Sequence, residues 1–322
     1  MGEIMGKTAF IFPGQGAQYV GMGKEFVENF PGSKQVFIEA NDSLGFDLLK
    51  IVMEGTDDEL KQTAITQPAI LTASVAILSA VTAEGFDCDY TAGLSLGEYT
   101  AHVKAESMAF RDAVKVVRQR GQFMQEAVPA GKGAMAAVIG MPIEKLKESL
   151  KQASLHGIVE IANFNSNEQM VISGEVAGVE AAVKIVMENG ALKAVNLPVS
   201  APFHSSMLKP AAEKLHEVLK NTPVFPMRKL VVTNVDAKVL KNEHEIVSSL
   251  VRQVNNSVLW VPSIELMIDE GVDTFVEIGP GKALSGFVKR IAKGKGVKVN
   301  IFNIEDMNSF RNYISSRNGE VK

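Results

Sequence analysis

Short apolar segments, each followed by a helical pattern, recur along this chain, and no other feature of the sequence constrains the fold as strongly. Residues 8–12 (TAFIF) form one such segment, which ends at Pro13 and Gly14. Residues 90–94 (YTAGL) form another and lead directly into a helical pattern. Continuous apolar runs are typical of strands buried on both faces. Strands that alternate with helices predict an α/β fold with a parallel sheet.

The middle of the chain has a different pattern. It begins at a cluster of breakers, Pro129, Gly131 and Gly133, and the segments that follow read β-α-β-β-α-β, which is typical of a ferredoxin-like unit. We therefore predict a small ferredoxin-like subdomain at residues 131–198, inserted into a discontinuous large α/β domain of residues 1–130 and 199–322.

The predicted elements of the large domain follow from the same patterns. The predicted strands lie at residues 8–12, 90–94, 230–233 and 274–278, and the predicted helices at residues 33–44, 68–83, 95–104, 111–127, 209–220, 243–254, 262–270 and 282–293. The short basic run at residues 293–298 is interpreted as a solvated turn.

Charge and hydropathy exclude several classes of protein. The 33 Lys and Arg residues against 37 Asp and Glu give a net charge of −4 at pH 7, so we expect no nucleic-acid partner and no membrane partner. The longest weakly polar stretch, residues 68–83, is shorter than the roughly 18–20 apolar residues that span a bilayer. We expect it to be a buried helix with Pro68 in its first turn.

Cysteine usage indicates the compartment. Cys88 is the only cysteine, which excludes an intrachain disulfide and a cysteine-built metal site and fits a reducing environment. The apolar run near the N-terminus is too short for a signal peptide. We therefore expect a cytoplasmic protein.

The segment Gly93 to Gly97 (GLSLG) lies between a predicted strand and a predicted helix, which is the context of a nucleophile elbow. Flanking glycines permit a tight turn that lifts the Ser95 hydroxyl into a cleft, and the following helix start directs free N–H groups at charge developing on an acyl group. The alternative is a glycine-rich helix start with Ser95 as an ordinary N-cap.

A serine nucleophile needs a histidine base, and the chain has five histidines. His204 lies in the rigid, weakly charged segment PVSAPFHS, and we favour it as the base. The other four are interpreted as solvated residues (His156, His216 and His244) or as a packing residue (His102). Asp112, the only aspartate between Ser95 and His204, begins a predicted helix, so a backbone carbonyl could orient the imidazole instead of a carboxylate.

A second glycine-rich loop, PGQG, follows the first predicted strand. A dinucleotide-binding fingerprint would require glycine where the chain has Tyr19, so we reject that interpretation. The loop could present backbone N–H groups to an oxyanion, or it could be a simple tight turn.

The order and spacing of several motifs carry a family resemblance. The motifs are PGQG at residues 13–16, GLSLG at 93–97, RGQFM at 120–124, NFNS at 163–166, PFHS at 202–205, VRQ at 251–253 and EIGPG at 277–281. Together they resemble the malonyl-CoA:acyl carrier protein transacylases of fatty-acid synthesis, almost from end to end. The resemblance implies a large α/β-hydrolase-like domain with a ferredoxin-like insertion, in agreement with the division above.

The resemblance also implies site roles. Ser95 is the expected nucleophile and His204 the expected general base and acid. The backbone amides of Gln15 and Leu96 are the expected oxyanion hole, and the main-chain carbonyl of Gln253 is expected to orient His204. At Leu94 many members of the family have histidine.

Two further residues are expected to bind the acyl group. The resemblance implies that Arg120 binds the free carboxylate of malonyl, and a guanidinium suits that role because it meets a carboxylate with two parallel hydrogen bonds. The alternative is a solvated basic face shared with Lys115 and Arg118. Phe203 would narrow the pocket near the α-carbon, an effect of about 1–3 kcal/mol per methyl group.

The function implied by the resemblance is a ping-pong acyl transfer from malonyl-CoA to the phosphopantetheine thiol of an acyl carrier protein, with no metal and no cofactor. Three alternatives stay open: a discrete acyltransferase serving a polyketide synthase, a serine thioesterase or esterase, and a non-catalytic carrier-docking protein. The resemblance implies an acidic carrier. Its candidate docking residues are Lys282, Lys289, Arg290, Lys293 and Lys295, unless these form an ordinary solvated helix face.

Overall fold

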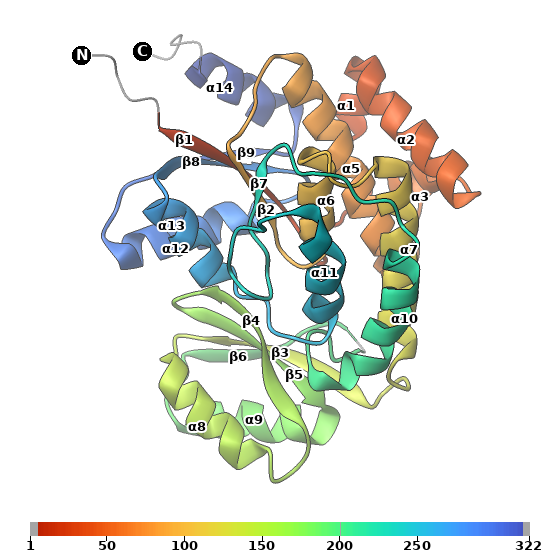
Figure 1. The fold of residues 1–322 in the computed structure, drawn as a ribbon. Coiled ribbons are helices and arrows are strands. Elements are labelled where there is room, and N and C mark those ends of the chain that lie inside the picture. Colours follow the sequence, from red (N-terminus) through yellow and green to blue (C-terminus); the bar gives the residue numbers. More distant parts are fainter. Residues whose placement is uncertain (1–5, 200, 318–322) are drawn as a thin grey trace.

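The computed structural model describes residues 6–199 and 201–317, and its strands form two sheets (Figure 1). The larger sheet is parallel, with the order β7-β2-β1-β8-β9. Its strands are β1 (Lys7–Phe12), β2 (Tyr90–Gly93), β7 (Leu230–Val231), β8 (Val272–Ile278) and β9 (Asn300–Ile304). The prediction of an α/β fold with a parallel sheet is confirmed.

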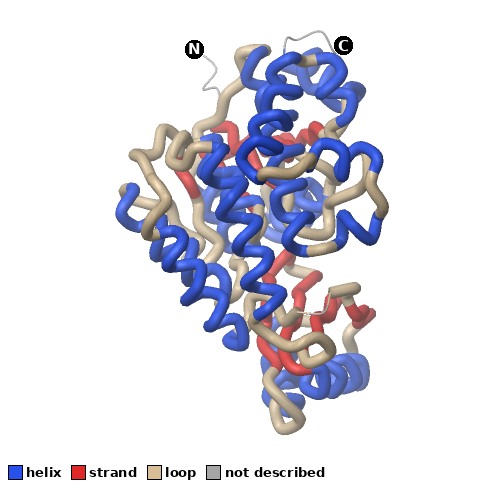
Figure 2. Tube along the Cα trace, turned by 90° about the vertical axis from the view of Figure 1, so that its right-hand side faces the viewer, coloured by secondary structure: helices blue, strands red, loops and turns tan. Residues whose placement is uncertain are grey.

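Both faces of β1 are buried, as its uninterrupted apolar sequence predicts. Ala9 and Ile11 pack with the helices α12 (Trp260–Asp269) and α13 (Ala283–Lys295). Phe10 and Phe12 point to the opposite face, where they belong to the same cluster as residues of α5 (Thr63–Ala83), α6 (Gly97–Lys104) and α14 (Met307–Arg317). The turned view in Figure 2 shows helices around these strands.

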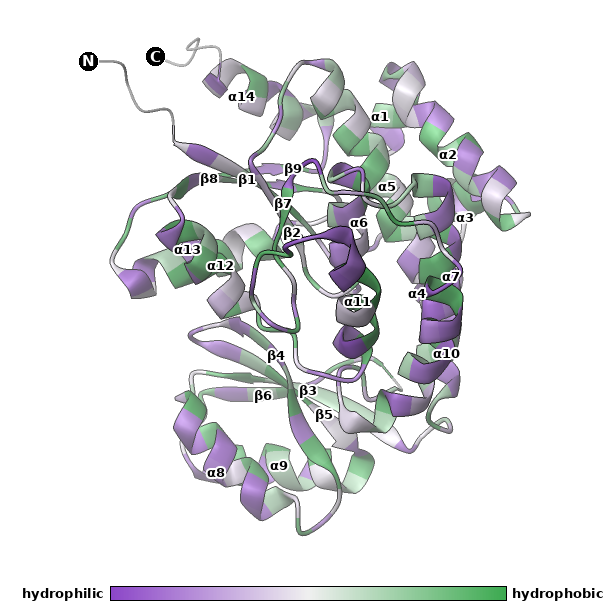
Figure 3. Ribbon diagram, in the orientation of Figure 1, coloured by the Kyte–Doolittle hydropathy of each residue, from purple (hydrophilic) through white to green (hydrophobic). Residues whose placement is uncertain are grey.

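Helix α5 is the one described helix long and apolar enough to cross a membrane, and 83% of its most apolar window is buried inside the protein. It is therefore a core helix, and Figure 3 shows it among the hydrophobic elements. The predicted start at Pro68 was wrong, because the helix begins at Thr63 and Pro68 lies inside it. The start of the helix packs closely against α7 (Phe110–Glu126), since a Cβ added at Gly121 would lie 2.6 Å from the Thr63 carbonyl oxygen.

The small sheet is antiparallel, with the order β4-β5-β3-β6. Its elements run in the order β3 (Gly133–Ile139), α8 (Ile143–Ala153), β4 (Val159–Ser166), β5 (Gln169–Glu175), α9 (Val176–Glu188) and β6 (Lys193–Asn196). Both helices belong to the same apolar cluster as the strands, and in Figures 1 and 2 they lie at the end of the molecule away from the large sheet. The β-α-β-β-α-β prediction is confirmed, whereas the boundaries at residues 131 and 198 stay a prediction.

Strand β4 joins the two units. Its residue Asn163 forms a parallel bridge with Val258, and the Phe164 amide donates to the Val258 carbonyl at 2.9 Å. The small sheet is thereby held against the segment that leads into α12, with its upper edge facing the carboxyl ends of the large-sheet strands (Figure 1).

The remaining elements complete the helical cover. They are α1 (Lys24–Asn29), α2 (Pro31–Leu44), α3 (Leu48–Glu54), α4 (Asp57–Lys61), α7 (Phe110–Glu126), the 3₁₀ turns Ser206–Leu208 and Glu243–Glu245, α10 (Lys209–Leu219) and α11 (Ile246–Val254). The prediction missed α1, α3, α4, β9 and α14. It also extended β7 to residue 233 and ended α13 too early, since α13 continues to Lys295 within the predicted turn.

Candidate active site

The turn between β2 and α6 holds Ser95 in an unusual backbone conformation, with φ of 53°. Both flanking glycines are required by close contacts. A Cβ at Gly93 would lie 2.0 Å from the Gly97 carbonyl carbon, and a Cβ at Gly97 would lie 2.1 Å from the Phe12 oxygen. The N-cap of α6 is Leu96, without a side-chain cap, so the alternative of Ser95 as an ordinary N-cap is wrong.

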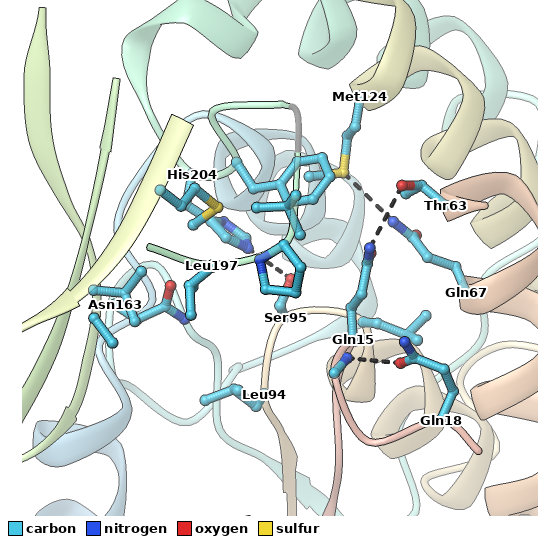
Figure 4. Close-up of a pocket in the computed structure, with 18 of the residues that line it drawn as sticks. Gln15, Gln18, Thr63, Gln67, Leu94, Ser95, Met124, Asn163, Leu197 and His204 are labelled. Carbon is cyan, nitrogen blue, oxygen red and sulfur yellow. Dashed lines mark hydrogen bonds between the residues drawn. The ribbon is translucent and has the colours of Figure 1, made fainter. Parts of the chain in front are cut away.

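The Ser95 hydroxyl and the His204 imidazole are in hydrogen-bond contact, with 2.6 Å between Oγ and Nε2 (Figure 4). The other ring nitrogen, Nδ1, lies 2.9 Å from the main-chain oxygen of Gln253. Because a carbonyl only accepts, Nδ1 carries the proton and Nε2 is free to accept one from Ser95. The structure thus brings together the three groups for which the family resemblance implied the roles of nucleophile, base and orienting carbonyl.

Electrostatics keep His204 neutral. The residue is 4% exposed, and burial, followed by the positive charge of Arg120, lowers the pKa of His204 to about 4. A neutral imidazole at pH 7 is the form that can accept a proton. The resting site therefore has its base in the competent state.

Arg120 is buried, so the alternative of a solvated basic face is wrong for this residue. Its Nη1 donates to Gln67 Oε1 at 2.8 Å, and its Nη2 donates to Ser95 Oγ and to Gln253 Oε1, each at 3.0 Å. Its Nε has no hydrogen-bond partner within the described part of the chain. Burial lowers the pKa of the guanidinium, yet none of its described hydrogen bonds goes to a carboxylate.

Arg118, two residues earlier on α7, has a different environment. It donates to the Leu44 carbonyl at 3.1 Å and lies over the Phe46 ring, outside the cavity. The same helix thus presents one arginine to the Ser95 site and one to its outer packing.

A cavity of about 420 Å³ opens between the two sheets, above the carboxyl end of β2. Its lining includes residues of the large domain (Gln15, Gln67, Leu94, Ser95, Leu96, Arg120, Met124, Phe203 and His204) and of the small sheet and the segment after β6 (Met135, Asn163, Asn165, Val171 and Leu197). Figure 4 shows Asn163 and Leu197 on one side of Ser95 and Gln67, Thr63 and Met124 on the other. An acyl group on Ser95 would lie between the two domains.

Gln15 and Leu96 both line the cavity. Within the described chain, no hydrogen bond is made by either of their backbone amides, which leaves both N–H groups available. The Gln15 side chain donates to Thr63 Oγ1 at 3.4 Å. Their role as an oxyanion hole stays a prediction, as does the role of Phe203, which is 7% exposed and borders the same cavity.

Two polar residues that were not predicted from the sequence hold the turn at Ser95. Asn234 accepts a hydrogen bond from the Ser95 amide at 2.6 Å and donates to the Gly93 carbonyl at 2.7 Å. Glu98, fully buried on α6, accepts from the Asn234 amide at 3.0 Å and from Gln253 Nε2 at 2.8 Å. Glu98 directly follows the GLSLG motif and could have been noticed, whereas no pattern in the sequence marks Asn234.

The remaining histidines lie elsewhere. His102 is buried on α6, with Nδ1 2.8 Å from Ser107 Oγ, and desolvation lowers its pKa to about 4. The side chains of His216 and His244 are 54% and 87% exposed, and His156 is exposed. Within residues 6–199 and 201–317, no group of three or more His, Cys, Asp or Glu side chains could hold a metal ion.

The predicted carrier-docking residues are spread along α13, from its N-cap to its last residue. Lys282 precedes the helix at the carboxyl end of β8, whereas Lys289 and Lys293 line a hollow with Asn300 near the amino ends of the strands. Lys295 pairs with Asp269 at 2.9 Å, and Arg290 lies 3.8 Å from Glu168. The docking role stays a prediction.

Comparison with known proteins assigns the family. The profile described as "Acyl transferase domain" matches residues 9–307. The chain is also 48% identical over 288 residues to "Malonyl CoA-acyl carrier protein transacylase" of Bacillus subtilis (strain 168), with 89% of this chain and 91% of that protein covered. The chain belongs to the malonyl CoA-acyl carrier protein transacylase family.

Solved structures of this transacylase family agree with the fold over at least 97% of this chain. The malonyl CoA-acyl carrier protein transacylase from Clostridium perfringens superposes with a TM-score of 0.93 at 46% identity, covering 98% of each chain. A malonyl-transacylase solved in complex with its type II polyketide synthase acyl-carrier protein has a TM-score of 0.92 at 40% identity, covering 97% of this chain and 99% of that chain. The fold class and the resemblance predicted from the sequence are confirmed.

Proposed function

We propose that this chain transfers the malonyl group from malonyl-CoA to the phosphopantetheine thiol of an acyl carrier protein, through a malonyl ester on Ser95, and so supplies fatty-acid chain elongation. One observation carries this proposal. The Ser95 hydroxyl contacts a neutral histidine and a buried arginine at once, at 2.6 Å and 3.0 Å. The first partner suits attack on a thioester, and the second suits an acyl group that ends in a carboxylate.

The first half-reaction loads the enzyme. His204 Nε2 takes the Ser95 proton as Oγ attacks the malonyl thioester carbonyl, and the imidazolium then protonates the coenzyme A sulfur as the C–S bond breaks. The free backbone amides of Gln15 and Leu96 are the proposed donors to the oxyanion, each worth about 3–4 kcal/mol. The Gln253 carbonyl stabilises the imidazolium that forms in between.

The second half-reaction transfers the malonyl group from Ser95 to the carrier protein. The thiol of the carrier's phosphopantetheine gives its proton to His204 and attacks the Ser95 ester, and the Ser95 oxygen recovers that proton when it leaves. Both thiols need only a channel to Ser95, and the cavity between the two sheets supplies one. No step requires an electron acceptor or a metal ion.

Selectivity for malonyl follows from Arg120. A buried guanidinium that gains a carboxylate partner only from the substrate is left without it when the acyl group is acetyl. Sites built for a polar partner reject analogues that lack it by about 10⁴-fold. Phe203 is the proposed limit on bulk at the α-carbon, which is a weaker filter of about 1–3 kcal/mol.

Intact-mass measurement tests the proposal. The protein is incubated with an equimolar mixture of malonyl-CoA, methylmalonyl-CoA and acetyl-CoA, and the mass added to the chain is recorded. We expect a malonyl adduct that is absent from Ser95→Ala and that disappears when a phosphopantetheinylated carrier protein is added. An adduct that persists in Ser95→Ala would contradict the assignment of the nucleophile.

A polyketide carrier is the second candidate acceptor, because one structural relative is solved with a type II polyketide synthase carrier protein. Parallel assays with both kinds of carrier separate the two. Water as acceptor, as in a thioesterase, is less well supported, since His204 is oriented by a carbonyl and not by the carboxylate of a hydrolase triad. Release of free malonate without carrier protein would favour the thioesterase function.

We propose a cytoplasmic location, in line with the single buried cysteine.

A further inference from the structure

We propose that Glu98 is a positioning residue of this acyl transfer, whose carboxylate aligns the Ser95 turn, the Gln253 segment and the Arg120 guanidinium as one unit. The inference rests on the proposed function and concerns a residue outside the cavity lining. Glu98 lies in the first turn of α6, three residues after the nucleophile, and is 0% exposed. It touches no position that a substrate atom could reach through the cavity.

Both hydrogen bonds to Glu98 converge on one oxygen. Oε2 accepts from the Asn234 amide at 3.0 Å and from Gln253 Nε2 at 2.8 Å. Oε1 has no hydrogen-bond partner among the described residues. A single buried oxygen atom thus links two segments that are far apart in the sequence.

The Gln253 arm reaches the base and the guanidinium. The Gln253 side chain accepts from Arg120 through Oε1 at 3.0 Å and donates from Nε2 to the Ser95 carbonyl at 2.9 Å as well as to Glu98. A cation on one end of this amide and an anion on the other favour one orientation of the amide group. The main-chain oxygen of the same residue accepts from His204, so the orientation of Gln253 also affects the base.

The Asn234 arm reaches the nucleophile. Its backbone amide donates to Glu98, while its side chain bonds to the amide of Ser95 and the carbonyl of Gly93. These two contacts brace the residue that has φ of 53°. Loss of the Glu98 contact would therefore loosen the strained turn and the base together.

Glu98 is also the anion that faces Arg120. The charged or titratable groups near Glu98 are Arg120 on α7, Asp236 after β7, Arg252 on α11 and the neighbouring Tyr99. Arg252 and Asp236 neutralise each other through two hydrogen bonds of 2.8 and 2.6 Å. Of these groups, Arg120 is therefore the cation without a direct carboxylate partner, and the Gln253 amide connects it to Glu98.

The charge of Glu98 changes near neutral pH. Burial raises the pKa of Glu98 to about 7, although the hydrogen bonds from Asn234 and Gln253 and the charge of Arg120 act in the opposite direction. Below this pH the carboxyl is protonated, and the amide of Gln253 loses its anionic partner. Alignment of the site is therefore expected to improve as pH rises through about 7.

The chain offers variants that separate charge from geometry. Glu98→Gln retains an oxygen that can accept both hydrogen bonds but removes the charge, whereas Glu98→Leu removes both. Glu277 provides the matched control. It is also fully buried, and burial also raises its pKa to about 7. Its carboxyl group accepts hydrogen bonds from the amides of Leu284 and Ser285 at the start of α13.

The test measures the rate of ester formation on Ser95 from malonyl-CoA and from acetyl-CoA between pH 5.5 and 9, with kcat and KM resolved for carrier transfer. We expect the wild type and Glu277→Gln to show a rise centred near pH 7. Glu98→Gln should lack this rise and should lose about ten- to hundredfold of its malonyl-to-acetyl preference, the range of a charge-assisted hydrogen bond. Glu98→Leu should lower kcat further, for both acyl groups.

Two results would overturn the inference. One is a Glu98→Gln variant with the wild-type pH profile and the wild-type malonyl-to-acetyl ratio, which would leave Glu98 a packing residue only. The other is loss of the same rise in Glu277→Gln, which would make it a general property of the fold. If the wild type itself formed no malonyl ester, the proposed function would be wrong and the positioning role with it, so the two failures are distinguishable.

Discussion

Arg120 donates a hydrogen bond from Nη2 directly to the hydroxyl oxygen of Ser95, at 3.0 Å. The same oxygen lies 2.6 Å from His204 Nε2. A cation at this distance favours negative charge on the serine oxygen, and it also contributes to the low pKa of His204. Arg120 thus lowers the pKa of the proposed base from the same position in which we propose that it binds a substrate carboxylate.

Replacement of Arg120 should change selectivity more than it changes the chemistry. In Arg120→Ala we expect malonyl transfer to fall by about 10⁴-fold and acetyl transfer to fall much less, because only malonyl has a carboxylate to pair with the guanidinium. The measurement is kcat/KM for both thioesters. Arg118→Ala is the control, since Arg118 lies on the same helix but contacts Leu44 and Phe46. Equal losses for the two acyl groups would show that Arg120 does not recognise the carboxylate.

At low pH, the rate of Ser95 acylation should follow the titration of His204. We call this part of the pH profile the acid limb. With the pKa of His204 at about 4, against its ordinary 6.5, the base is neutral at any pH above about 4, so acylation of Ser95 should rise as pH increases through that value. Rapid pH-jump measurement in Glu98→Gln isolates this limb from the titration of Glu98. Adding Arg120→Ala to this variant should raise the pH at which the acid limb is centred, because removal of the cation favours the imidazolium form of His204. A limb near 6.5 with Arg120 intact would contradict the assignment.

The parts of the fold that could be predicted are those with a strong periodic signal. β1 and β2 are uninterrupted apolar runs, and the small subdomain follows its β-α-β-β-α-β order between clear breakers. β9 was missed because asparagines interrupt its sequence, NIFNI, and it lies at the edge of the sheet. The short helix α4 depends on a local cap, the Thr56 capping box, more than on an apolar face, since Leu60 is the buried residue of this helix.

The site could be predicted where chemistry limits the choice. Few serines in any chain lie between glycines, and few histidines lie in a rigid segment. Ser95 and His204 could therefore be proposed from the sequence. The burial of Arg120 could not, because Lys115 and Arg118 share its helix and only the packing around α7 separates them. The bond between Glu98 and Asn234 joins residues 136 positions apart, and no spacing rule indicates such a pair.

The elbow should not tolerate a methyl group. Gly97→Ala would place Cβ 2.1 Å from the Phe12 carbonyl oxygen, which belongs to the neighbouring strand and cannot move freely. We expect a loss of about 1–3 kcal/mol in unfolding free energy, or more, together with loss of acylation. Gly286→Ala is the control, because its added Cβ would meet only Arg290 at 3.6 Å inside α13. There helix propensity predicts a gain of up to about 1 kcal/mol. The unfolding free energies of both variants are measured by urea denaturation. Equal changes in the two variants would contradict the close contact at Gly97.

His102 should make the fold sensitive to acid. Its pKa is about 4 in the folded state against an ordinary 6.5, so between these values the unfolded chain binds a proton that the native site does not. This difference in proton binding contributes about 3 kcal/mol to the unfolding free energy. The contribution is complete above pH 6.5 and is lost as pH falls toward 4. Glu98 and Glu277, whose pKa values are raised to about 7, act in the opposite sense.

Comparison with His102→Asn isolates the pH-dependent contribution of His102 to the unfolding free energy, because the asparagine can still bond to Ser107 but does not titrate. Urea unfolding free energies at pH 4.5 and pH 7 are measured for both proteins. On acidification the wild type should lose more stability than the variant, by up to about 3 kcal/mol. His204, Glu98 and Glu277 are present in both proteins and cancel in the difference. Parallel stability curves would show that His102 is protonated in the folded state as readily as in the unfolded chain.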